Sequence, residues 1–206
     1  MNVRYILIGA LILAALFAVH RFFPDDFTPI TNYPSNGTDI IAFGDSLVVG
    51  LGSTAGNDFV TQLARKIKNP IVNLGENGNT TADALARISA LDGYRPKVVI
   101  LLLGGNDYLK RVDPEKTFEN LSKIIEEIQK RGATVLLLGV RGGVIVDHFK
   151  PQFETLRETY HTAYHKDVLD GLFGNTKFMS DEVHPNDAGY ALIADRVAPV
   201  LASLLK

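Results

Sequence analysis

DIIAFGDSL, residues 39–47, joins a short apolar run directly to a polar turn. An apolar run of this length, bounded by turn residues, is typical of a buried β-strand. Three further runs have the same character, and a weaker fifth follows near the end of the chain. The expected strands are therefore Asp39–Phe43, Pro70–Leu74, Lys97–Leu103, Ala133–Gly139 and Thr176–Met179. Strands that are apolar on both faces indicate a sheet that is covered on both sides.

Segments with a helical period of apolar residues separate these runs. They are Asp58–Lys68, Thr81–Leu91, Asp113–Arg131, Pro151–Leu169 and Asn186–Leu205. Alternating strands and helices predict an α/β fold, a three-layer α/β/α sandwich around a parallel, flavodoxin-like sheet of about five strands. An N-terminal apolar helix adds to this domain. In such sheets, sites form where the carboxyl ends of the strands meet loops.

Length and composition fit one ordinary globular domain. The chain has 206 residues, of which 46% are apolar and 21% are charged. A formal net charge of −2 provides no basic face for a phosphate backbone, so nucleic acid is not an expected partner. The chain has no cysteine, which excludes disulfides, cysteine nucleophiles and thiolate zinc sites, and which fits an oxidising compartment.

The N-terminus departs from this ordinary composition. Tyr5–Val19 carries no charge, and its length lies between a signal-peptide core of about 7–15 residues and a spanning helix of about 20. Arg4 and Arg21 can extend its apolar reach by snorkelling, and this favours an uncleaved anchor over a removed signal for residues 1–21. The protein is then exported and membrane-anchored, facing the periplasm or cell exterior, or is secreted if the segment is cleaved. Three prolines in residues 22–38 predict a linker before the domain at 39–206.

Four polar blocks follow the expected strands or precede the last helix. They are Gly44-Asp45-Ser46-Leu47, Gly75 to Thr81, Gly104-Gly105-Asn106-Asp107, and Asp181-Glu182-Val183-His184-Pro185-Asn186. Each has an ordinary interpretation by itself: a serine after a strand is usually a helix N-cap, and glycine-rich loops usually serve a turn. Together they bring a hydroxyl, an imidazole, a carboxylate and an amide to one sheet edge. That set is complete for acyl transfer.

These blocks resemble the sequence motifs of the GDSL, or SGNH, hydrolases. Gly44 to Leu47 looks like the defining block, Asn73 to Thr80 like the second, Gly104 to Asp107 like the third, and Asp181 to Pro185 like the Asp-x-x-His-Pro block. The resemblance covers Asp39 to about Leu204. It implies a serine esterase that hydrolyses carboxylic ester or thioester bonds, similar to the branch of lysophospholipases, arylesterases and acyl-CoA thioesterases.

The resemblance also implies a role for each site residue. Ser46 is the nucleophile, His184 the base that takes its proton, and Asp181 the carboxylate that orients the imidazole. Three donors stabilise the oxyanion: the backbone N–H groups of Ser46 and Gly78 and the side-chain amide of Asn106. We expect Asp45 and Asp107 to support the loops. We expect no cofactor and no metal, because the carboxylates and histidines lack any ligand spacing.

Rival functions are less well matched. A dinucleotide-binding loop is suggested by Gly50 and Gly52, but no third glycine follows three residues later, and an ordinary α/β-hydrolase needs a glycine where Val48 stands. A non-catalytic binding module leaves a complete set of site residues unexplained.

Within the same family, the alternative is a carbohydrate O-acetylesterase. The apolar loop at residues 140–146, together with Phe149 and Phe153, either lines an acyl-chain groove, which favours thioester or lysophospholipid substrates, or packs on the sheet edge.

Overall fold

A computed structural model describes residues 29–142 and 147–206, and it contains a five-stranded sheet whose paired strands are all parallel. The strand order is β2-β1-β3-β4-β5. The strands are β1 (Asp39–Gly44), β2 (Val72–Gly75), β3 (Pro96–Leu102), β4 (Thr134–Leu138) and β5 (Ala163–His165). The parallel α/β prediction is therefore confirmed, and four of the five expected strands lie within two residues of their expected bounds.

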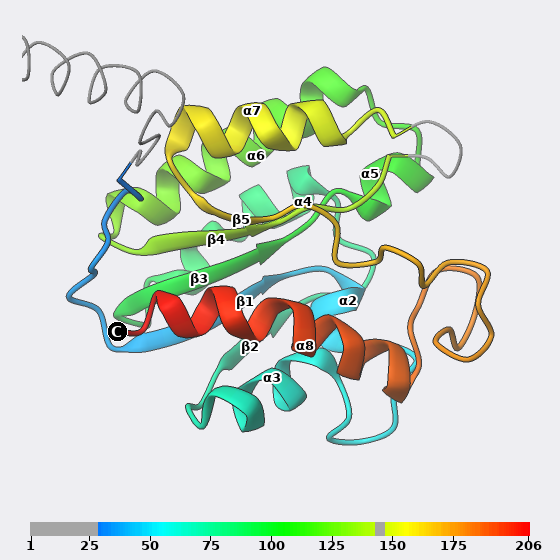
Figure 1. Ribbon diagram of the computed structural model, residues 1–206. Coiled ribbons are helices and arrows are strands. Elements are labelled where there is room, and N and C mark those ends of the chain that lie inside the picture. The colour runs from blue at the N-terminus through cyan, green and yellow to red at the C-terminus, as the bar shows by residue number, and fades with distance from the viewer. Residues whose placement is uncertain (1–28, 143–146) are drawn as a thin grey trace, which may run out of the picture.

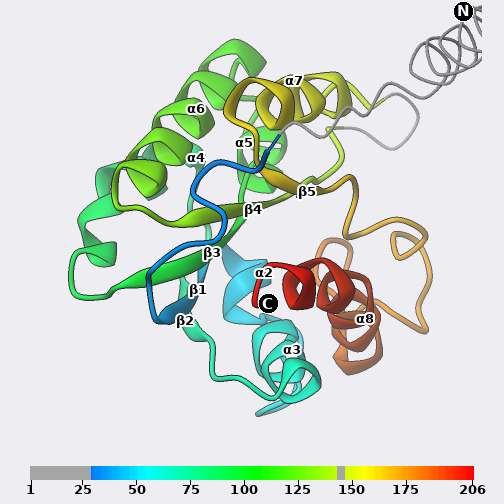
Figure 2. The ribbon, with the colours of Figure 1, turned by 60° about the vertical axis from the view of Figure 1, so that its left-hand side comes forward.

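Helices cover both faces of the sheet (Figures 1 and 2). On one face lie α4 (Thr81–Ala86), α5 (Gly105–Leu109), α6 (Pro114–Lys130) and α7 (Lys150–Tyr160), with the 3-10 helix η1 (Ile88–Leu91) after α4. On the other face lie α2 (Ser46–Val49), α3 (Phe59–Ile67) and α8 (Asp187–Ser203). This is the expected three-layer α/β/α sandwich.

The strand order places a topological switch point between β1 and β3. After β1 the chain crosses to β2 on one side, and it then returns to β3 on the other side of β1. Loops that leave two such strands in opposite directions open a crevice at their carboxyl ends, and ligands bind there in open α/β sheets. Ser46 follows β1 and Asn106 follows β3. The topology alone therefore brings two of the predicted site residues to one crevice.

The core and the helix ends follow from local chemistry. Residues 98–102 of β3 are all buried, as a central strand that is covered on both faces requires. Asp113 caps α6 through its side chain and Pro114 occupies the first turn, where its missing N–H costs nothing. Gly132 follows α6 with φ +77°, a left-handed conformation that glycine adopts without steric cost. These three signals were visible in the sequence.

The prediction of the fifth strand was wrong. The strand is Ala163–His165, which lies inside the segment expected to be a helix from Pro151 to Leu169. Helix α7 stops at Tyr160 because His161 takes a left-handed φ of +49°, and three residues are too few to show a strand period. The expected strand at Thr176–Met179 is a turn, and only Met179 forms a single antiparallel bridge, to Pro185.

The described residues before β1 lie along the sheet edge opposite the carboxyl ends of the strands (Figure 1). The Ser35 hydroxyl donates to the Gly132 carbonyl, and the Thr38 N–H donates to the Arg95 carbonyl, just before β4 and β3. Of the expected linker, the part from residue 29 onward is thus bonded to the domain. The expected apolar helix and anchor at 1–21 lie outside the described residues. In the described ranges, no helix is both long and apolar enough to cross a membrane.

Candidate active site

Ser46 lies at the turn where β1 passes into α2. The Asp45 side chain caps this short helix by accepting from the Leu47 N–H at 3.0 Å, and Gly50 ends it with φ +88°. The backbone N–H of Ser46 donates to no acceptor in the described part of the chain. The turn therefore presents the Ser46 hydroxyl and a free backbone donor in the same place.

His184 and Asp181 lie in one tight turn before α8. The Nδ1 of His184 lies 2.8 Å from Oδ2 of Asp181, and Nε2 lies 3.1 Å from Oγ of Ser46. The other carboxylate oxygen of Asp181 accepts from the backbone N–H groups of Val183 and His184 at 2.8 and 2.7 Å. The hydrogen bond from His184, followed by these backbone bonds, holds the pKa of Asp181 at about 2. An ionised Asp181 fixes the proton of His184 on Nδ1, which leaves Nε2 to accept from the serine.

The last helix, expected from Asn186, begins at Asp187 in the structure. Asn186 is the N-cap of α8, and its side-chain oxygen accepts from the N–H groups of Ala188 and Gly189. The Asn186 backbone N–H and side-chain amide donate to carbonyls of the 177–179 turn. These bonds satisfy the carbonyl groups of that turn, whose Phe178 and Met179 N–H groups donate back to the Asn175 carbonyl. They also brace the turn that carries His184.

The predicted oxyanion donors come from three separate segments. Gly78 has a left-handed φ of +74°, no atom within 4 Å of where a β-carbon would lie, and a backbone N–H with no acceptor among the described residues. The Asn106 amide donates to the Asn79 carbonyl at 3.0 Å, so α5 is tied to the loop that holds Gly78. Lys110 strengthens this tie by donating to the Gly78 carbonyl at 2.9 Å.

Asp45 and Asp107 support the loops, as expected. Asp107 is fully buried and accepts from both the backbone N–H and the hydroxyl of Thr81, at 2.9 and 2.6 Å. It thereby joins α5 to the start of α4. Asp45 is 2% exposed, and burial raises the pKa of its carboxyl to about 7, against the smaller opposing effects of the Leu47 N–H and of His184.

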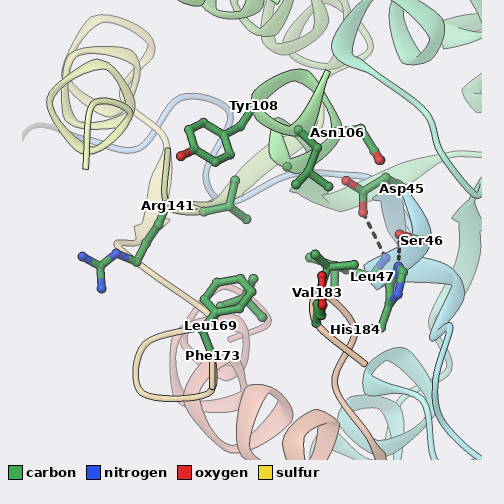
Figure 3. A pocket seen from close by; sticks show the side chains of 14 residues that line it. Asp45, Ser46, Leu47, Asn106, Tyr108, Arg141, Leu169, Phe173, Val183 and His184 are labelled. Carbon is green, nitrogen blue, oxygen red and sulfur yellow. Dashed lines mark hydrogen bonds between the residues drawn. The ribbon is translucent and has the colours of Figure 1, made fainter. Parts of the chain in front are cut away.

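An apolar cavity of about 220 Å³ opens from the serine (Figure 3). Ser46, His184 and Asn106 lie at one end, and Tyr108, Leu169 and Phe173 lie at the other. The rest of the wall consists of Asp45, Leu47, Gly105, Leu109, Val140, Arg141, Glu182 and Val183. Leu109 at the rim is 56% exposed. The cavity suits a hydrocarbon chain whose end carries the reacting carbonyl.

Sequence reasoning found part of this wall. Val140 and Arg141 line the cavity, but Phe149 and Phe153 do not, because both are buried in an aromatic cluster with Phe118. The ring of Phe149 also packs edge-on against the ring of Tyr108, with 6.0 Å between the ring centroids. The aromatic cluster therefore supports the cavity wall on the side away from the cavity. The remaining part of the expected groove, residues 143–146, lies outside the described residues.

Sequence reasoning did not find Tyr108, Leu109, Leu169 and Phe173. The first two directly follow the Gly104–Asp107 block, so their position after β3 was a usable signal. Leu169 and Phe173 belong to a long irregular loop without any period, and no sequence pattern points to them. Within residues 29–142 and 147–206, no group of three or more acidic or histidine side chains is placed to hold a metal ion.

Comparison with known proteins finds similarity to esterases and acylhydrolases. The GDSL-like Lipase/Acylhydrolase family matches residues 42–192. Esterase TesA of Pseudomonas aeruginosa is 29% identical over 178 residues, which cover 81% of this chain and 89% of that protein. Thioesterase 1/protease 1/lysophospholipase L1 of Escherichia coli is 27% identical over 175 residues, covering 81% and 84%. The crystal structure of AlinE4, an SGNH-hydrolase family esterase, is similar with a TM-score of 0.65 at 31% identity, covering 83% of this chain and 98% of AlinE4.

Proposed function

The chain belongs to the GDSL-like Lipase/Acylhydrolase family and is a serine hydrolase of ester bonds, and we propose that it works through an acyl-enzyme on Ser46. One observation carries this proposal. The Nε2 of His184 lies 3.1 Å from the Ser46 hydroxyl although the two residues are 138 positions apart in the sequence. The same imidazole contacts Asp181 through its other nitrogen. Acyl transfer to a serine requires that the nucleophile contacts a base and that the base contacts an orienting carboxylate.

Each residue then has a defined step. His184 Nε2 takes the proton of the Ser46 hydroxyl as its oxygen attacks the carbonyl carbon, and the carbonyl oxygen becomes an oxyanion. The N–H groups of Ser46 and Gly78 and the Asn106 amide donate to that oxyanion. Collapse of the intermediate breaks the bond to the alcohol or thiol, which leaves with the proton from His184. Water, activated by the same His184, releases the acid and restores Ser46.

The lining of the cavity favours an acyl chain as the part of the substrate that binds there. Its wall beyond the polar end is formed by apolar side chains such as Leu47, Tyr108, Leu169 and Phe173. A chain of several methylenes gains about 0.8 kcal/mol for each CH₂ that it buries there, whereas an acetyl group uses almost none of this surface. Short to medium acyl esters and thioesters, including those of lipids, are therefore favoured over acetylated sugars.

A fluorophosphonate probe tests the proposed nucleophile directly. The probe labels an activated serine, and mapping of the labelled peptide should give Ser46 alone. Labelling should be absent in Ser46→Ala and strongly slowed in His184→Ala. Hydrolysis of p-nitrophenyl butyrate should fall on the order of 10⁶-fold in both variants, and about 10⁴-fold in Asp181→Asn. Equal rates for wild type and Ser46→Ala would end the esterase proposal.

A chain-length series tests the substrate class. On p-nitrophenyl esters from acetate to palmitate, kcat/KM should rise beyond acetate and peak at a short to medium chain. Phe173→Ala lengthens or widens the far end of the cavity, so its peak should move, while an exposed aromatic residue outside the cavity, Tyr94, provides the control as Tyr94→Ala. A series that peaks only at acetate would favour the carbohydrate O-acetylesterase instead.

We further propose that the protein is exported and held at a membrane by residues 1–21. The support is the uncharged run Tyr5–Val19 between Arg4 and Arg21. N-terminal sequencing of the mature protein should give an uncleaved start, with the activity in the membrane fraction. A mature start near Val19 would show instead that the segment is a removed signal.

A further inference from the structure

The Arg87 guanidinium joins three segments that end at the site. Its Nη2 donates to the Gly44 carbonyl at 2.8 Å, its Nη1 donates to the Leu74 carbonyl at 3.1 Å, and its Nε donates to the side-chain oxygen of Asn79 at 2.5 Å. The guanidinium also lies over the Phe43 ring, 4.3 Å from its centroid. The side chain is only 16% exposed, so these bonds form largely away from water.

Each of these partners lies within four residues of a predicted oxyanion donor in the sequence. Gly44 is two residues before Ser46 and ends β1. Leu74 is next to last in β2, whose following loop carries Gly78. Asn79 follows Gly78 and accepts the Asn106 amide on its backbone carbonyl. A single planar group thus contacts the supports of all three donors, although Arg87 itself does not line the cavity.

We propose that Arg87 is a positioning residue that fixes the oxyanion donors relative to one another. This inference rests on the oxyanion roles of Ser46, Gly78 and Asn106 in the proposed function. Donors stabilise a developing charge only when they are held in place before the reaction. A tie between the ends of β1 and β2 and the 75–80 loop limits the independent movement of those donors.

Arginine suits this task better than lysine does. Its planar fork carries five N–H donors in fixed directions, and three of these positions meet acceptors on three different segments. A lysine ammonium at the same place has no planar fork and cannot reproduce these directions. The ring of Phe43 beneath the guanidinium adds a stacking surface that an ammonium uses less well.

The chain offers a matched control in Arg131. It is similarly shielded, at 22% exposure, and it donates to the Asp92 carboxylate, the Glu127 carboxylate and the Glu127 carbonyl. It lies at the end of α6, just before β4, on the sheet edge opposite the site. Loss of Arg131 therefore removes a comparable set of bonds without touching the oxyanion loop.

The test compares Arg87→Ala, Arg87→Lys and Arg131→Ala in the full chain, at a temperature where circular dichroism shows all three folded. We expect kcat of Arg87→Ala to fall about 10²-fold with KM nearly unchanged, because misplaced donors affect the transition state and not substrate binding. Arg87→Lys should recover only part of that loss. Arg131→Ala should keep wild-type kcat even if its melting temperature falls as far as that of Arg87→Ala.

A transition-state analogue separates positioning from general stability. The affinity for an alkyl boronic acid, which forms a tetrahedral adduct on the serine, should fall in Arg87→Ala by a factor similar to the loss of kcat/KM. The affinity for butyrate, the product, should not change. If Arg87→Ala does not fold, Arg87→Gln replaces it in the same comparison.

Two outcomes would overturn the proposal in different ways. A folded Arg87 variant that matches Arg131→Ala in kcat and in boronic acid affinity would show that Arg87 serves stability alone, while Ser46→Ala still loses its turnover. Retained turnover in Ser46→Ala would reject the proposed function, and the role of Arg87 with it.

Discussion

The carboxyl of Asp45 lies directly before the serine and is almost completely buried. Its pKa is raised by burial to about 7, from an ordinary value of 3.8. The folded protein therefore holds a proton on Asp45 between about pH 4 and pH 7 that the unfolded chain has lost. Stability that depends on this group falls as the pH rises through that range, and it levels off above pH 7.

Asp45→Asn should remove this pH dependence. The asparagine oxygen can still accept from the Leu47 N–H, so the cap of α2 is kept, while the ionisable group is lost. Relative to wild type, the free energy of unfolding of the variant should rise by roughly 2–3 kcal/mol between pH 5 and pH 8. Urea denaturation at both pH values measures it. A difference that stays constant over this range would contradict the raised pKa.

The proposed mechanism requires an amide N–H donor at position 106, and a carboxylate cannot replace it. Asn106→Ala removes one proposed oxyanion donor, and kcat should fall about 10²- to 10³-fold with little change in KM. Asn106→Asp should lose at least as much, because a carboxylate repels the oxyanion. Steady-state kinetics on p-nitrophenyl butyrate decide this, and an unchanged kcat in Asn106→Ala would remove the residue from the oxyanion hole.

Close packing of strand ends on helices sets the position of the nucleophile. At Gly75, the last residue of β2, a β-carbon would lie 2.5 Å from the Val49 nitrogen and 3.0 Å from the Asp45 carbonyl oxygen. These are backbone atoms, which can yield only if α2 moves. Glycine at this position therefore lets β2 and the nucleophile turn approach each other closely.

Gly75→Ala should displace α2 and its serine. We expect the free energy of unfolding to fall by about 1–3 kcal/mol and kcat to fall with it, because a shift near 1 Å at a reacting group can cost about 10²-fold. Gly93→Ala is the control, since no atom lies within 4 Å of its added carbon. Gly93→Ala should stay within about 0.5 kcal/mol of wild type. Equal behaviour of the two variants would show that α2 adapts to the added carbon.

At the scale of the whole molecule, the active site and residues 31–38 lie at opposite ends of the strands of the sheet. Residues 31–38 bond to groups that directly precede β3, β4 and β5, whereas Ser46 and Asn106 follow the carboxyl ends of β1 and β3. If residues 1–21 form the proposed anchor, their removal should leave kcat and KM for p-nitrophenyl butyrate unchanged, while the protein leaves the membrane fraction. Activity assays on the separated fractions check this, and a truncated enzyme with lower kcat would mean that the segment contributes to the site.

The sequence alone determined the elements whose signals are local. Short apolar runs predicted four of the strands, and caps such as Asp113 and Gly132 predicted helix ends, because strand burial and capping depend on neighbouring residues. Ser46, Asn106, Asp181 and His184 stand in blocks that follow strand ends or precede the last helix, and the resemblance of those blocks to the GDSL hydrolase motifs implied their roles. Only the tertiary structure decided what depends on contacts distant in sequence. The three-residue β5, the cavity wall at Leu169 and Phe173, and the links of Arg87 to Gly44, Leu74 and Asn79 arise where segments without any shared pattern pack together, and no local periodicity encodes such contacts.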